Sequence, residues 1–374
     1  MGRNLHRRAF LVVFCLALRC AAQESQPSKT YFVYLVCEGA DKIAVVRFGP
    51  DGAMVDHTLH TGVMPGADIS GPHGIVMSPD RQFYYVTLAH GRPYGQALKY
   101  RTKDDAVVGH VTLGNFPATV DITPDGNFIY EVNFNLHGDM VPSSVSVVAT
   151  DEMVEAARIP TCVMPHGSRL NPSGTKQYSA CMMDDMLVEI DTAKFGVSRH
   201  FILSKGKETG VTGPPSVDHY EMKSATCSPT WAQPSADGKS IYVACNKSDE
   251  IVEVDADSWS LRRRISAGPG VYNLAISKDG KMVATNKRGQ SVSVFELDSG
   301  REVARLQTKR KVPDGVVVTP DNRYAFVAVE GIGSEPGTVE VFDLTSLKTV
   351  ATVDVPEQAV GIDFWKVESS TAPR

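Results

Sequence analysis

A four-residue turn recurs along this chain and constrains its fold more than any other feature. It reads Ser-Pro-Asp-Arg at 78–81 and Thr-Pro-Asp-Gly at 123–126, and a β-branched and aromatic stretch follows each copy. The copies begin at Ser78, Thr123, Asn171, Ser235, Ser277 and Thr319. Successive copies are 45, 48, 64, 42 and 42 residues apart. A period in this range predicts repeated copies of one supersecondary unit within a single domain.

Each copy of the repeat has the pattern of four short strands. An apolar strand precedes the turn, in which Gly supplies a positive φ and Asp bonds its own backbone. A β-branched strand follows at 240–244, for example, and an alternating strand at 251–255. A closing strand such as 302–306 completes the unit. Four antiparallel strands at this period are typical of propeller blades.

The two ends of the chain together supply one more blade. Residues 31–37, 42–47 and 54–59 have the pattern of second, third and fourth strands, and a lone first strand lies near 361–365. We therefore predict an all-β fold, a seven-bladed β-propeller that closes by pairing its C-terminal strand with the N-terminal blade. The predicted segments are an N-terminal linker at 23–30, the propeller at 31–367 with an insertion at 205–227, and a C-terminal tail at 368–374.

Residues 1–22 have the composition of a secretory signal peptide. A basic start is followed by an apolar run at 9–18 and a small-x-small cleavage site at 20–22. Arg7 and Arg8 also resemble the twin-arginine export motif, so two export routes stay open. Removing this segment leaves 34 basic and 43 acidic residues. The chain is therefore predicted to be periplasmic or secreted, without a transmembrane anchor or a nucleic-acid partner.

Export permits disulfide bonds among the cysteines that remain. These are Cys37, Cys162, Cys181, Cys227 and Cys245, enough for at most two bridges with one thiol left over. Cys181 and Cys245 occupy the same place in neighbouring repeats, and Cys162 and Cys227 both precede first strands. A bridge among these four is one interpretation, with Cys162–Cys227 as the favoured pair, and buried free thiols are the other.

Two phrases resemble the YVTN family of β-propeller repeat proteins. They are Ser-Pro-Asp-x-x-x-Tyr-Tyr-Val-Thr at 78–87 and Ser-Ile-Tyr-Val-Ala-Cys-Asn at 240–246. The resemblance covers nearly all of residues 31–367 and implies relatives among exported binding proteins, surface-layer proteins and lactonases. Haem d1 domains and nitrous oxide reductases have broadly similar propellers. The chain has neither a Cys-x-x-Cys-His haem attachment motif nor an adjacent histidine pair, which argues against both.

The strand register predicts which side chains reach the mouth of the central channel. In such folds the first strand begins at this face and the second strand ends there. Counting back eight residues from the end of each turn gives His73, Ala118, His166, Thr230, Tyr272 and Asp314, with Ala359 or Val360 in the composite blade. Loops after second strands add Glu38, Asp41, His90, His137, Asp184, Asp185, Asn246, Lys287 and Glu330, and the insertion adds His219. The remaining histidines, His57, His60, His110 and His200, fall on or beside fourth strands.

Imidazoles and a carboxylate from distant repeats suit a site for Zn²⁺, Cu²⁺ or Fe²⁺. The tentative metal ligands are His73, His166, His137 and Asp314, with His90 as an alternative third ligand. Met182, Met183 and Met186, with Met164 and Cys181 nearby, would suit copper, although methionine also fills cores. Histidines that bind a metal-free ligand or ordered water are the remaining interpretations.

Three functions stay open at this point. The first is an exported propeller that binds a small molecule or a protein at its channel mouth, with or without a divalent or copper ion. The second is a metal-dependent lactonase or lyase, and the third is a protein-interaction or cell-surface scaffold without catalysis. The candidate ligand-binding residues are His73, His90, His137, His166, His219, Tyr272, Asp314 and Glu330.

Overall fold

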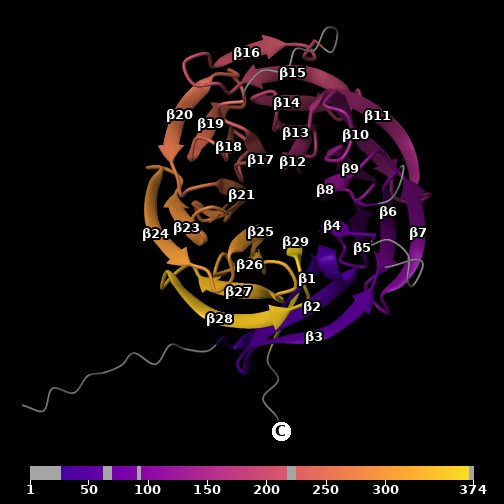
Figure 1. The fold of residues 1–374 in the computed structure, drawn as a ribbon, viewed down its shortest axis with the longest axis vertical. Coiled ribbons are helices and arrows are strands. Elements are labelled where there is room, and N and C mark those ends of the chain that lie inside the picture. Colours follow the sequence, from indigo (N-terminus) through magenta and orange to yellow (C-terminus); the bar gives the residue numbers. More distant parts are fainter. Residues whose placement is uncertain (1–26, 62–69, 91–93, 217–224, 370–374) are drawn as a thin grey trace, which may run out of the picture.

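Seven antiparallel sheets form a ring around a central axis in the part of the chain that the structure describes (Figure 1). The computed structural model describes residues 27–61, 70–90, 94–216 and 225–369. The predicted seven-bladed propeller is therefore confirmed. The expected signal peptide at 1–22 and His219 lie outside the described residues. No helix among these residues has the length and hydropathy needed to cross a membrane.

Blades 1 to 3 occupy the N-terminal part of the ring and take one strand from the C-terminus. Blade 1 contains β29 (Ala359–Ser369), β1 (Lys29–Cys37), β2 (Lys42–Gly49) and β3 (Gly52–His60), with a short 3₁₀ helix at Glu38–Ala40. Blade 2 contains β4 (Pro72–Met77), β5 (Phe83–Leu88), β6 (Gln96–Arg101) and β7 (Ala106–Thr112). Blade 3 contains β8 (Pro117–Ile122), β9 (Phe128–Asn133), β10 (Pro142–Ala149) and β11 (Val154–Val163).

Blades 4 to 7 continue around the ring in sequence order. Blade 4 contains β12 (Pro165–Leu170), β13 (Lys176–Cys181), β14 (Met186–Asp191), β15 (Gly196–Ile202) and a fifth strand, β16 (Thr209–Thr212), from the insertion. Blade 5 contains β17 (Pro229–Pro234), β18 (Ser240–Cys245), β19 (Glu250–Asp255) and β20 (Leu261–Ser266). Blade 6 contains β21 (Val271–Ile276), β22 (Lys281–Asn286), β23 (Ser291–Glu296) and β24 (Arg301–Gln307). Blade 7 contains β25 (Val312–Val318), β26 (Tyr324–Glu330), β27 (Gly337–Asp343) and β28 (Lys348–Val355).

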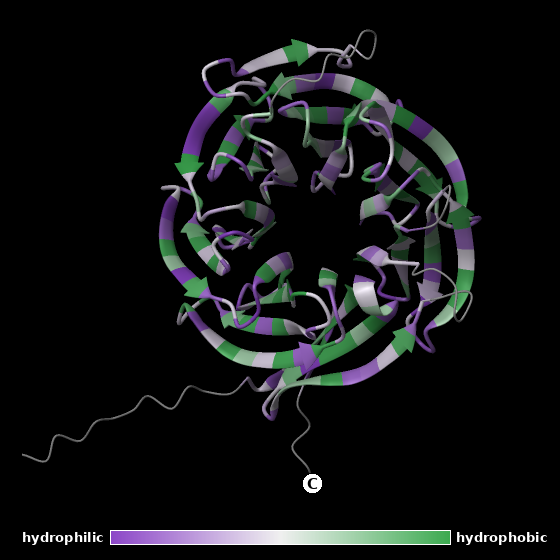
Figure 2. Cartoon of the chain, viewed as in Figure 1, coloured by the Kyte–Doolittle hydropathy of each residue, from purple (hydrophilic) through white to green (hydrophobic). Residues whose placement is uncertain are grey.

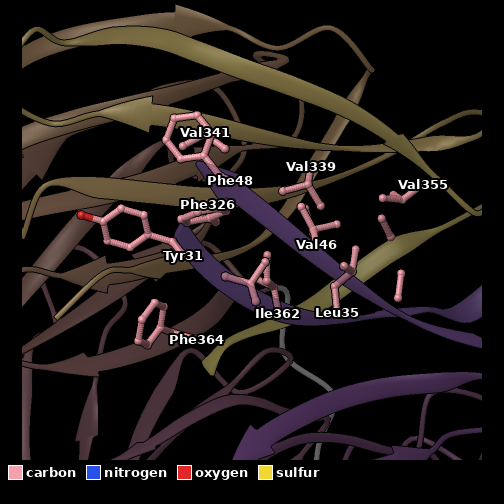
Figure 3. Packing of buried hydrophobic residues seen from close by; sticks show 14 of the residues in the cluster. Tyr31, Leu35, Val46, Phe48, Phe326, Val339, Val341, Val355, Ile362 and Phe364 are labelled. Atoms are coloured by element: carbon pink, nitrogen blue, oxygen red, sulfur yellow. The ribbon is translucent and has the colours of Figure 1, made fainter. Parts of the chain in front are cut away.

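The ring closes where β29 pairs with β1, as predicted from the lone first strand. The pairing runs from Lys29 opposite Ser369 to Cys37 opposite Ala359, so the strands extend slightly beyond the predicted 31–367. Apolar side chains of blades 1 and 7 pack across this junction, among them Phe48, Phe326 and Val341 (Figure 3). Burying each such side chain contributes about 1.5–3 kcal/mol, so the junction has a core of its own.

The repeated turn is held by one hydrogen-bond device in five of the blades. The hydroxyl before the turn donates to the Asp two residues later, as Ser78 Oγ does to Asp80 Oδ1 at 2.6 Å. The same bond starts at Thr123, Ser235, Ser277 and Thr319. The last turn residue has a positive φ, 79° at Gly126 but also 62° at Arg81. These bonds explain why the turn predicts the strand register reliably.

Burial differs between inner and outer strands in the way that a ring of sheets requires. Every residue of β18 is buried, because blades cover both of its faces. The fourth strands form the outer wall, except in blade 4, where β16 lies outside β15, and hydrophilic and hydrophobic residues are interspersed along this wall (Figure 2). In β24, for example, exposed and half-buried residues alternate over much of its length. The polar groups available for chemistry therefore gather at the ends of inner strands.

Candidate functional site

The starts of four first strands bring the predicted residues to one mouth of the channel. His73 lies in β4, His166 in β12, Tyr272 in β21 and Asp314 in β25. Val360 takes the equivalent place in blade 1, because Ala359 pairs with Cys37 as Pro72 pairs with Leu88. The glycine after each Pro-His lets neighbouring blades approach closely, since a Cβ on Gly74 would overlap the carbonyl of Ala118.

Glu38 joins two of the predicted histidines. It follows β1, and its Oε2 accepts a hydrogen bond from His73 Nδ1 at 2.6 Å. Its Oε1 accepts from His90 Nε2 at 2.7 Å. The side chains of Glu38 and His73 are only 11% and 16% exposed, so water screens the pair weakly.

This pair changes the titration of both groups. Burial alone would raise the pKa of Glu38, but the charge and hydrogen bonds of His73 and His90 hold it well below its usual value. Burial alone would lower the pKa of His73, but the Glu38 carboxylate raises it above its ordinary value. With Nδ1 donating to Glu38, the Nε2 of His73 has no hydrogen-bond partner among residues 27–61, 70–90, 94–216 and 225–369.

His166 is held in a single neutral form. Its Nδ1–H donates to the carbonyl of Thr230 at 2.8 Å, and its Nε2 accepts from the Tyr272 hydroxyl at 3.0 Å. Burial lowers the pKa of His166 to about 4. The imidazole therefore stays neutral near pH 7, and both of its nitrogens are engaged inside the protein.

A lysine between two carboxylates forms the charged side of the mouth. Lys287 Nζ lies 2.5 Å from Asp314 Oδ2 and 3.3 Å from Glu330 Oε1. It also lies 3.8 Å from the centre of the Tyr272 ring. Burial alone would lower the pKa of Lys287, but the carboxylates raise it, so this lysine carries a positive charge. Burial raises the pKa of Glu330 to about 7.

Aromatic rings line the other side of the mouth. Phe116, which precedes β8, lies with its ring centre 5.5 Å from that of His73, 5.2 Å from His90 and 5.4 Å from His137. Phe134 lies 4.7 Å from His166. The structure thus brings His73, His90, His137 and His166 around two phenylalanines.

The channel beneath the mouth is narrow. His73, His166 and Asp314 line a cavity of about 30 Å³ together with apolar residues deeper in the ring, such as Ile75 and Val316. A cavity of this size holds one or two water molecules. A ligand larger than water therefore cannot enter this cavity.

The structure gives the expected metal centre no support. Among the described residues, no group of three or more His, Cys, Asp or Glu side chains is arranged to hold a metal ion. His73 and His166 lie with ring centres 6.4 Å apart, but each uses a nitrogen for Glu38, Thr230 or Tyr272. A metal at this mouth stays a prediction.

The disulfide pairing differs from the favoured one. Cys162 bonds to Cys181 and Cys227 bonds to Cys245, so Cys162–Cys227 was wrong, and Cys37 stays a buried free thiol. In both bridges a cysteine that precedes a first strand bonds to the cysteine that ends the following second strand. Cys162 near the end of β11 thereby links blade 3 to blade 4, whereas Cys227–Cys245 lies at blade 5. A disulfide-bonded Cys181 has no thiolate to offer to copper.

Sequence reasoning missed the contacts of two charged residues at the mouth and overlooked two phenylalanines there. Glu38 and Lys287 were placed on the correct face, but their central contacts were not foreseen. Phe116 and Phe134 were not considered, although Phe116 stands directly before the first strand of blade 3 and Phe134 directly after its second strand. Asp185 has a structural contact, since it accepts backbone hydrogen bonds from residues 226–228.

Comparison with known proteins supports the fold. No protein-family model matches the chain, so the YVTN resemblance stays a prediction. A periplasmic gluconolactonase of Pseudomonas aeruginosa is similar at 20% identity and a TM-score of 0.66, over 90% of this chain and 99% of that one. A Bacteroides fragilis protein provisionally named a 6-phosphogluconolactonase is 15% identical with a TM-score of 0.65, over 92% and 99%. Hydrazine synthase of Kuenenia stuttgartiensis is 21% identical with a TM-score of 0.62, over 80% and 92%. At these identities the likeness establishes the propeller fold.

Proposed function

We propose that this protein binds and hydrolyses a small cyclic ester, a lactone, at the channel mouth. The observation that carries the proposal is the Glu38–His73 pair, in which a buried carboxylate orients an imidazole and leaves its Nε2 available. This is the arrangement that a general base needs. Two of the similar propellers are named as lactonases, which agrees with the proposal in substrate class.

The proposed reaction uses groups on both sides of the mouth. Nε2 of His73 takes a proton from water as the water oxygen attacks the carbonyl carbon. The negative charge that develops on the carbonyl oxygen is stabilised by the ammonium of Lys287, whose third N–H is not needed by Asp314 and Glu330. The ring C–O bond then breaks, and the imidazolium of His73 returns the proton to the leaving oxygen, which gives a hydroxy acid.

His166 and Tyr272 keep the two charged groups apart in this proposal. The neutral imidazole and the phenol are hydrogen-bonded to each other, and Tyr272 lies against Lys287. Lys287 and Asp314 both act electrostatically on His73, which supports one shared site. The role of His166 and Tyr272 is therefore to position Lys287 and the substrate.

The proposal is tested by titrating the acid released from unsubstituted γ- and δ-lactones. His73→Gln should lower kcat/KM about 100-fold or more, since a positioned base contributes 10²–10⁴-fold. His110→Gln, in the outer strand β7, is the matched control and should keep the rate. Hydrolysis no faster than in buffer, or equal rates in the wild type and His73→Gln, would overturn the proposal.

A further inference from the structure

One loop at the mouth exposes several large apolar side chains to solvent. The segment 134–141 joins β9 to β10 and carries His137. Leu136 is 42% exposed, Met140 40% and Val141 51%. Among the described residues, these are three of the five large apolar side chains exposed on loops that follow second strands, the others being Tyr94 and Ile332.

A buried apolar cluster adjoins this exposed segment and supports it. Phe116 and Phe134 are buried in one cluster, and Met164 and Met182 pack against it. Two of the methionines that suggested copper, Met164 and Met182, thus pack against an apolar cluster between blades 3 and 4, and Met186 packs against another. Polarisable, flexible side chains of this kind adapt to apolar ligands of varied shape.

The loop that carries the exposed side chains is held in place. Asn135 Nδ2 donates to the carbonyl of Asp139 at 2.9 Å, and Asn115 Nδ2 donates to Asn135 Oδ1 at 2.9 Å. Gly138 N–H donates to the carbonyl of Asn135 at 3.1 Å. The apolar side chains are therefore presented before any ligand arrives, which lowers the entropic cost of binding.

The opposite side of the mouth is charged, through Lys287, Asp314 and Glu330. The cavity below holds only one or two waters, so a substituent on a bound ring cannot pass down the channel. It cannot lie favourably on the charged side either. Within the described residues, the loop 134–141 beside His137 offers the largest group of exposed apolar side chains at this mouth.

We propose that the natural ligand is an amphipathic lactone with a linear apolar chain. This inference rests on the proposed function, because the ring is placed between His73 and Lys287. The alkyl chain lies over Leu136, Met140 and Val141. The length of this alkyl chain therefore determines the affinity of the ligand for the protein.

The test is a calorimetric titration with γ-lactams, which resemble lactones but are not hydrolysed under these conditions. The lactams carry methyl, butyl, hexyl or octyl substituents. Wild-type affinity should rise about two- to fourfold per methylene, as partial to full burial of a CH₂ predicts. The triple variant Leu136→Ser, Met140→Ser, Val141→Ser should flatten this dependence.

The matched control is Val107→Ser with Val108→Ser on β7, which removes exposed apolar groups from the outer wall and should leave the dependence unchanged. Affinity independent of chain length, no binding of any lactam, or an unchanged dependence in the triple variant would overturn the inference. Hydrolysis of a methyl lactone is measured on the same samples. Chain-dependent binding without hydrolysis would refute the proposed reaction alone, and hydrolysis without chain dependence would refute the ligand class alone.

Discussion

Replacing Glu38 with Gln removes one negative charge from the mouth and nearly preserves the side-chain volume. The wild-type carboxylate lies 2.6 Å from His73 Nδ1 and 2.7 Å from His90 Nε2. Two unit charges 4 Å apart attract by about 4 kcal/mol at an effective dielectric constant of about 20. Burial of His73 offsets part of this attraction, but the net effect of Glu38 is a raised pKa. In Glu38→Gln the pKa of His73 should therefore fall.

The pH–rate profile of kcat/KM for a γ-lactone measures this change. A general base must be neutral to accept a proton, so the wild-type rate should rise with pH through a pKa above the ordinary 6.5 of histidine. The Glu38→Gln profile should rise at lower pH. Its plateau should fall about 10- to 1,000-fold, because Gln orients the imidazole less well and makes it a weaker base.

Stability supplies an independent readout of the same substitution. The raised pKa of His73 stabilises the fold below 6.5, and this contribution is lost as pH rises through the folded pKa. The lowered pKa of Glu38 stabilises the fold above 4.5 and is lost at lower pH. Glu38→Gln should therefore lower the free energy of unfolding most near pH 6, by at most about 3–5 kcal/mol, and by clearly less at pH 9.

Glu335→Gln is the matched control for both measurements, because Glu335 lies exposed in the loop between β26 and β27. It should change neither the pH–rate profile nor the unfolding free energy by more than about 0.5 kcal/mol. The reasoning fails if the Glu38→Gln profile keeps the wild-type midpoint and plateau. An equal loss of stability at pH 6 and pH 9 would show that the pair is not an ion pair.

Three further predictions concern stability and the metal. Glu131 is fully buried in β9, neither of its oxygens has a hydrogen-bond partner in the part of the chain that the structure describes, and burial raises its pKa well above the usual value. Glu131→Met should raise the unfolding free energy by about 1–3 kcal/mol at pH 8, and less at pH 4, in denaturant titrations; a loss at pH 8 would contradict this account. Replacing Cys227 and Cys245 together by Ala opens a loop with a sequence separation of 18 and should cost about 3 kcal/mol, and dithiothreitol should destabilise the variant, which keeps Cys162–Cys181, less than the wild type. The proposed reaction uses His73 and Lys287 directly, so a chelator should leave lactone hydrolysis within about twofold of the untreated rate; loss of turnover that a divalent ion restores would transfer the role of polarising the carbonyl to a metal.

The propeller could be predicted because the residues that form each repeated turn are close together in the sequence. A hydroxyl, an Asp two residues later and a residue of positive φ recur at each turn, and these fix the strand register. That register then placed His73, His166 and Asp314 at one mouth. The outcome follows from sequence alone, because equivalent residues of a closed ring converge on its axis.

The contacts within the mouth could not be predicted in the same way. Glu38 reaches His73 from the end of a different strand in a different blade, and only the distance between blades decides that contact. The pairing of Cys162 with Cys181 was missed for another reason. The repeat placed equivalent cysteines before first strands and at the ends of second strands, and pairing each of the former with the next of the latter gives both repeats the same bridge.

The most direct test of the central claim is where a lactone analogue binds. Histidine side chains labelled in the imidazole ring report this by NMR during titration with a γ-lactam. Binding at the mouth should shift the signals of His73, His90 and His137. The signals of His110, in the outer strand β7, and of His200, buried in β15 beside β16, should stay in place. Shifts confined to His110 and His200, or no shift at saturating lactam, would contradict the account.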